Sequence, residues 1–244
     1  MKSFGRAFDL IFAFIVINVI PILSGVIANL FKSSLSSIDP DSVFFWVTIH
    51  HISQLVLTII LMKLFIHTNL SMWGFNLNQF QSSLRIFASF CLIYLIPVFL
   101  YNVLPNLIFA TIPNFNYSLN PRNVVGTLGF QFLLSGFGEE PLFRGFVMTF
   151  LSQSWKGDVR VGNIHFPIVG IWATLFFMFA HANINYTTLS IHISFWQQIW
   201  ALGLGLYYAA VFDKTKSLLA PILSHGYSNG IIFVILYTWA LLWR

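Results

Sequence analysis

Residues 136–145 read GFGEEPLFRG and lie inside a long apolar segment, 124–155, that otherwise has the composition of a membrane span. Glu139 and Glu140 are the only glutamates in the chain. A charged side chain at the centre of a membrane helix costs about 2.5–3.5 kcal/mol on insertion scales, and residues that carry this cost usually have a function. The segment therefore predicts a membrane-embedded helix with a site built around the glutamate pair.

Helix geometry separates the two glutamates. Successive helical residues point about 100° apart, so Glu139 and Glu140 cannot share a face. Glu140 and Arg144 are four residues apart, in the favourable order of acid before base. We expect Arg144 to neutralise Glu140, leaving Glu139 to act elsewhere; a purely structural ion pair is the alternative, but it leaves Glu139 without a role. Pro141 has no N–H, which predicts a kink in the helix.

The composition is that of a membrane protein. Charged residues make up 8% of the chain and hydrophobic residues 57%, whereas soluble domains average roughly 25% charged residues. We therefore expect an all-α, polytopic transmembrane helical bundle. The net charge of +5 comes without a dense basic cluster, so we expect no nucleic-acid partner. The single cysteine, Cys91, excludes an internal disulfide.

Apolar runs predict seven spans, at residues 8–31, 43–66, 85–110, 124–155, 166–184, 191–212 and 218–243. The fourth exceeds the roughly 20 residues that a bilayer requires, and eight spans result if it is two pieces. We divide the chain into N-terminal helices and loops (1–123) and a catalytic core (124–244), within one integral-membrane domain.

The basic residues predict the orientation of the bundle. With seven spans and a cytoplasmic N-terminus, the cytoplasmic side holds Lys2, Arg6, Lys63, Arg85, Lys156, Arg160, Lys214 and Lys216, and the outer side holds Lys32, Arg122 and Arg244. Cytoplasmic loops of membrane proteins carry the excess of Lys and Arg. A multi-pass protein with its N-terminus in the cytoplasm is therefore expected.

Polar residues recur deep in three of the predicted spans. Besides the glutamates, His181 ends the run FMFAH in the fifth span, and the last span contains HGYSN, in which His225 and Asn229 share one helix face. A lone buried histidine is most often bonded to a backbone carbonyl, but the combination predicts an active site within the bilayer, between the fourth, fifth and last spans. In the second span, His50 and Gln54 share a face and predict an interhelical hydrogen bond.

These residue types suit the addition of water to a carbonyl group. A desolvated glutamate can act as a general base, and a neighbouring histidine can hold the water or pass a proton. A second histidine and an amide can stabilise the oxyanion. A zinc-binding HExxH helix is absent, and the aspartates lie at span ends or in loops, at positions 9, 39, 41, 158 and 213. The residues therefore indicate an intramembrane hydrolase.

Three motifs occur in order: EExxxR at 139–144, FxxxH at 177–181 and HxxxN at 225–229. With them, residues 124–232 resemble the CAAX-protease and bacteriocin-processing (CPBP, or Abi) family of intramembrane endopeptidases. The resemblance implies that water is activated by Glu139 and His181 and that the oxyanion is stabilised by His225 and Asn229. It also implies that Glu140 and Arg144 support the site or position the substrate.

The resemblance implies a membrane-associated peptide or protein substrate, lipidated in some members, and a place in the plasma membrane if the source is bacterial. Bacterial members are linked to peptide processing and bacteriocin immunity. The family is often described as metalloproteases, and Glu139, His181 and His225 could form a three-ligand zinc site. Two other functions stay open: a non-catalytic immunity or scaffold protein, and a proton-coupled transporter, because buried Glu and His also relay protons.

Overall fold

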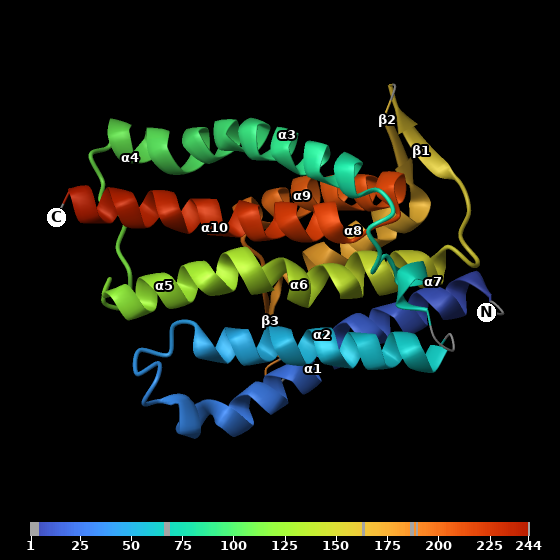
Figure 1. The fold of residues 1–244 in the computed structure, drawn as a ribbon, viewed down its shortest axis with the longest axis horizontal. Helices are drawn as coiled ribbons and strands as arrows, with labels where there is room; N and C mark the ends of the chain where they lie inside the picture. Colours follow the sequence, from blue (N-terminus) through green and yellow to red (C-terminus); the bar gives the residue numbers. More distant parts are fainter. Residues whose placement is uncertain (1–4, 66–68, 163, 186–187, 189, 244) are drawn as a thin grey trace.

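The computed structural model describes residues 5–65, 69–162, 164–185, 188 and 190–243. It is a helical bundle in which long helices lie side by side, with α10 between the α3 and α5–α6 layers and with α1 and α2 beyond α6 (Figure 1). The elements in chain order are α1 (Arg6–Leu35), α2 (Phe45–Phe65), η1 (Leu70–Trp73), α3 (Phe80–Val98), η2 (Phe99–Val103), α4 (Leu104–Ile108), α5 (Pro121–Gly129), η3 (Phe130–Leu134), α6 (Ser135–Glu140), η4 (Pro141–Met148), α7 (Thr149–Leu151), β1 (Asp158–Val161), β2 (Ile164–Pro167), α8 (Ile168–Ala180), β3 (Asn183–Asn185), β4 (Ser190–His192), α9 (Phe195–Thr215) and α10 (Leu219–Leu242).

The helix that carries the glutamates is continuous from α5 to α7, but two of its segments, η3 and η4, are π-helical. A π-helical turn uses hydrogen bonds between residues five apart and often occurs at functional sites. η4 begins at Pro141, which has no N–H to donate to the preceding turn. The irregularity expected at this proline therefore takes the form of a π-helical segment. All residues of η4 are buried, so its one charge, on Arg144, must be balanced inside the protein.

Helix α2 packs between α1 and α6 through polar contacts as well as apolar ones. His50 Nε2 lies 3.1 Å from the backbone oxygen of Pro21 in α1. Gln54 Nε2 donates to the backbone oxygen of Gly138 in α6, at 3.0 Å. The predicted interhelical hydrogen bonds from His50 and Gln54 are thus confirmed. The Gln54 bond ties α2 to the residue that precedes the glutamate pair.

Two short antiparallel hairpins, β1–β2 and β3–β4, interrupt the otherwise helical fold. The first lies in the predicted loop 156–165 and extends into the predicted fifth span; the second begins inside that span. α8 has only 13 residues, about 20 Å, which is shorter than the hydrocarbon core. Pro167 precedes its first residue, and the alternation of Asn and Ile at 183–185 favours a strand over a helix. The expected helix at 166–184 was therefore too long.

Among the residues that the structure describes, four helical stretches are long and apolar enough to cross a membrane: Arg6–Ser34, Phe45–Phe65, Phe80–Ile108 and Leu219–Leu242. They agree in position with the first, second, third and last predicted spans. The predicted fourth span is helical from Pro121 to Leu151, with π-helical interruptions, and α9 covers most of the sixth. A helical membrane protein is confirmed at this level, whereas the count of seven or eight spans stays a prediction.

Glycines allow α10 to cross the glutamate helix at short range. A Cβ atom added at Gly136 would collide with the backbone oxygen of Ile222, and one added at Gly226 would collide with the backbone oxygen of Phe132. Small residues permit this close approach of membrane helices. Because His225 is adjacent to Gly226, the crossing also sets how near this histidine lies to the glutamates.

We expect Gly226→Ala to destabilise the protein, because the new methyl group meets backbone that cannot rotate away. Overpacking of this kind costs about 1–3 kcal/mol, which a lower thermal midpoint in detergent would report. Gly203→Ala in α9 is the matched control, since no described atom lies within 4 Å of its added Cβ. Equal midpoints for the two variants would contradict the close crossing.

Candidate active site

Glu140 and Arg144 form an ion pair with no exposed side-chain surface. Arg144 Nη1 donates to Glu140 Oε1 at 3.1 Å, and Nη2 donates to the backbone oxygen of Gly205 in α9, at 3.0 Å. The guanidinium also lies over the rings of Phe177 and Tyr208, with its carbon 4.6 and 5.2 Å from their centroids. The pairing predicted from the spacing is confirmed, and the rings add cation–π stabilisation.

The same oxygen of Glu140 also binds His225. The distance from His225 Nδ1 to Glu140 Oε1 is 2.7 Å, and the imidazole stacks on Tyr208 with 5.3 Å between centroids and 11° between planes. A carboxylate accepts, so His225 carries a proton on Nδ1. Its Nε2 lies 3.9 Å from Glu139 Oε2. Glu140 therefore fixes both the orientation of His225 and the nitrogen that faces Glu139.

Glu139 points away from Arg144, as the helix geometry predicted, and contacts His51 on α2. Its Oε1 lies 3.2 Å from His51 Nε2, whereas its Oε2 is buried without a hydrogen-bond partner among the described residues. His51 was not among the residues predicted for the site. The one available signal was the unusual pair of adjacent histidines in an apolar span.

His181 lies immediately after the last residue of α8. Its Nδ1 lies 2.8 Å from the backbone oxygen of Phe177, and its ring packs against the Phe177 ring with 4.3 Å between centroids. Because a carbonyl oxygen only accepts, Nδ1 carries the proton and the lone pair of the neutral imidazole is on Nε2. His181 therefore offers an acceptor nitrogen, as does His225 when it is neutral.

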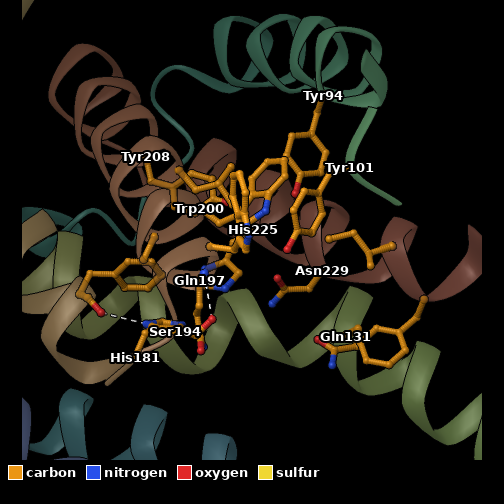
Figure 2. Close-up of a pocket in the computed structure, with 16 residues that line it drawn as sticks. Tyr94, Tyr101, Gln131, His181, Ser194, Gln197, Trp200, Tyr208, His225 and Asn229 are labelled. Atoms are coloured by element: carbon orange, nitrogen blue, oxygen red, sulfur yellow. Dashed lines mark hydrogen bonds between the residues drawn. The ribbon is translucent and has the colours of Figure 1, made fainter. Parts of the chain in front are cut away.

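Two cavities bring the predicted residues together. A cavity of about 270 Å³ is lined by Glu139, His181, His50, Gln54 and Phe143, among others. A second, of about 440 Å³, is lined by His181, His225 and Asn229 together with aromatic residues. Figure 2 shows His181, His225 and Asn229 around this cavity, with Tyr94 and Tyr101 on another wall. His181 lines both cavities. The two cavities, whose walls hold all four predicted catalytic residues, therefore adjoin at this histidine.

The acidic and histidine side chains of the site are also possible metal ligands. Within the described ranges, no group of three His, Cys, Asp or Glu side chains is placed to hold one ion. The zinc ligand set of Glu139, His181 and His225 stays a prediction; Glu139 Oε2 and His225 Nε2 lie 3.9 Å apart in this structure.

The site can combine a buried carboxylate oxygen, two imidazoles and an amide around a cavity. This set can take a proton from water and donate hydrogen bonds to a developing oxyanion. Its members come from α6, the residue after α8, and α10, which are far apart in the sequence.

The family model described as Type II CAAX prenyl endopeptidase Rce1-like matches residues 121–231. This range contains all three motifs and supports the assignment to the CAAX-protease family. No curated protein sequence and no solved structure matches the chain.

We expect Arg144→Leu to destabilise the fold strongly, because it leaves Glu140 buried without its cation. Breaking one partner of a buried pair costs about 3–5 kcal/mol, so the thermal midpoint and the yield of monodisperse protein in detergent should both fall. Asp213→Asn is the control, since it breaks the exposed pair between Asp213 and Lys216, worth about 0–1 kcal/mol. Similar losses for both variants would contradict a supporting role for the buried pair.

Proposed function

We propose that this chain is an intramembrane endopeptidase in which Glu139 activates the attacking water. The observation that carries the proposal is Glu139 Oε2, a buried carboxylate oxygen without a partner among the described residues and 3.9 Å from His225 Nε2. A structural ion pair accounts for Glu140 and Arg144 but leaves this oxygen unexplained. The family match over residues 121–231 supports proteolysis as the reaction class.

The first step is attack of water on the scissile carbonyl carbon. Glu139 Oε2 takes one proton from the water while His181 Nε2 accepts a hydrogen bond from the other O–H and orients the nucleophile. A C–O bond forms, and the carbonyl π electrons move onto its oxygen. The product is a tetrahedral oxyanion, and Glu139 is protonated.

His225 and Asn229 are placed to stabilise this oxyanion. They lie four apart on α10 and line the same cavity, and the Asn229 amide can donate directly. His225 can donate from Nε2 when both ring nitrogens carry protons, and its Nδ1 then donates to the carboxylate of Glu140. Donors fixed in advance around a developing oxyanion usually provide the largest catalytic contribution.

The intermediate collapses when the leaving nitrogen takes the proton held by Glu139. The C–N bond breaks, its electron pair goes to the protonated nitrogen, and the products are a carboxylic acid and an amine. Glu139 returns to its starting state. Each proton that leaves the water is thereby accounted for without a further co-reactant.

The walls of the cavities favour an apolar substrate segment. A cavity of about 560 Å³ lies between α3 and α9 and shares Tyr94, Trp200 and Leu204 with the 440 Å³ cavity beside His225. Its other lining residues are mostly apolar, among them Ile86, Phe90 and Ile93. This continuity supports a membrane-associated peptide with a lipid chain or apolar side chains near the cleaved bond.

The central test is cleavage of lipidated and unlipidated peptide libraries by the purified protein in detergent. We expect Glu139→Gln and His181→Ala to lower kcat by about 10²–10⁴ while the variants stay folded, because each removes a proton-transfer or water-orienting group. His165→Gln is the control; this histidine is half exposed on the β1–β2 hairpin.

Full cleavage by both folded variants would overturn the mechanism. A chelator is expected to leave the activity unchanged, and loss of cleavage that zinc restores would instead establish a metal-dependent reaction. Proton-coupled uptake into vesicles, in place of cleavage, would identify a transporter.

We expect Asn229→Leu to lower kcat by about 10²–10³ with KM unchanged, because an oxyanion donor acts only in the transition state. Gln131→Leu is the matched control, since Gln131 lines the same cavity but has no role in the proposed steps. Steady-state kinetics on one cleaved peptide separate the two parameters. A raised KM with normal kcat would assign Asn229 to substrate binding.

A further inference from the structure

His51 of α2 contacts the oxygen of Glu139 that does not face His225. The distance from His51 Nε2 to Glu139 Oε1 is 3.2 Å, and the two side chains are 13% and 19% exposed. Glu139 Oε2, by contrast, is without a partner in the described part of the chain. The two oxygens of one carboxylate are thus distinguished: one is tied to a neighbouring helix, and the other faces the site.

Neighbouring residues fix the position of the His51 side chain. Its Nδ1 lies 2.9 Å from the backbone oxygen of Val47, one turn earlier, and its ring meets Phe130 edge-on at 4.8 Å. A Cβ atom at Gly138 would collide with the imidazole, so the absence of a side chain at this position gives His51 its place beside Glu139. The Gln54 bond to the Gly138 carbonyl holds the same two helices together one turn away.

The adjacent histidine lacks this arrangement. His50 Nε2 lies near the backbone oxygen of Pro21, and its ring stacks on Trp46 with 5.1 Å between centroids and 11° between planes. His50 therefore joins α2 to α1, whereas His51 joins α2 to the glutamate helix. His50 also lines the 270 Å³ cavity, but of the two histidines only His51 is hydrogen-bonded to Glu139.

The hydrogen bonds of His51 limit where its protons can lie. Val47 offers only an acceptor, so Nδ1 carries a proton. A hydrogen bond between Nε2 and Oε1 then requires one further proton between them, whichever atom holds it. The pair as a whole is neutral in either arrangement, which lowers the cost of placing it in a buried region.

We propose that His51 is a positioning residue that binds Glu139 Oε1 and thereby leaves Oε2 as the oxygen that accepts the proton of the attacking water. This proposal rests on the proposed function of Glu139 as the base. His51 itself does not touch the water or substrate in this role. It restricts rotation of the carboxylate, and an error of about 1 Å in the placement of such a group can cost about 10²-fold in rate.

A measurement without substrate tests the contact itself. In protein labelled with ¹⁵N-histidine, the His51 ring signals are identified by their loss in His51→Gln. We expect Glu139→Gln to shift the His51 ring nitrogens and to leave those of His165, on the β1–β2 hairpin, nearly unchanged. Asp213→Asn, remote from α2, is the control. Unshifted His51 signals in a folded Glu139→Gln variant would overturn the proposal, whatever the activity.

Kinetics test the role. His51→Leu keeps an apolar side chain of similar reach but removes the hydrogen bond, and we expect kcat to fall at least about tenfold with KM little changed. His51→Gln keeps an N–H donor and is expected to restore most of the loss. His165→Leu is the control, because it removes a histidine that is half exposed on the β1–β2 hairpin and lines neither cavity of the site.

Rescue by glutamine, together with near-normal kcat in His165→Leu, supports positioning by a hydrogen bond. Equal losses in His51→Leu and His51→Gln, or normal kcat in both, would overturn the proposal. If folded Glu139→Gln still cleaves at the wild-type rate, the proposed function fails instead, and the labelled histidine spectra still decide whether His51 holds Glu139.

Discussion

One carboxylate oxygen, Glu140 Oε1, joins the glutamate helix to α10 at the centre of the bundle. It accepts from Arg144 on its own helix and from His225 on α10, and Arg144 also bonds the Gly205 carbonyl of α9. An unpaired charge at this depth would be costly, so each partner is needed to keep the others buried. The interaction that neutralises the glutamate helix therefore also fixes the orientation of a histidine in the site.

The neighbouring glutamate can be reactive because it is excluded from this network. Glu139 is turned about 100° around the helix from Glu140, the partner of Arg144, and Glu139 Oε2 has no partner among the described residues. The π-helical segment begins at Pro141, directly after the two glutamates. The helix therefore changes from α to π geometry immediately after the structural carboxylate, Glu140, and the candidate base, Glu139. The structural carboxylate and the candidate base are thus both glutamates of one helix, and they differ in the direction in which their side chains leave it.

Local spacing predicted the parts of the site that lie within one helix. The Glu140–Arg144 pair, the divergence of Glu139 and the shared face of His225 and Asn229 all follow from the helical repeat. The hydrogen bond from His225 to Glu140 was not predictable, because 85 residues separate them and the crossing of α10 depends on tertiary packing at Gly136 and Gly226. The hairpins were missed because their strands have only three or four residues, too few for a clear alternation of apolar and polar side chains.

His51 contacts the site although it belongs to none of the three sequence motifs. It lies outside residues 121–231, the range that matches the family, and in the part of the chain that composition alone identifies only as apolar helices. Two adjacent histidines gave no basis for choosing between them, since the face of α2 that meets α6 is set by Gly138 and Gln54 in the folded protein. Because one of these histidines reaches Glu139, the boundary between an N-terminal scaffold and a catalytic core at residue 124 divides the sequence but not the site.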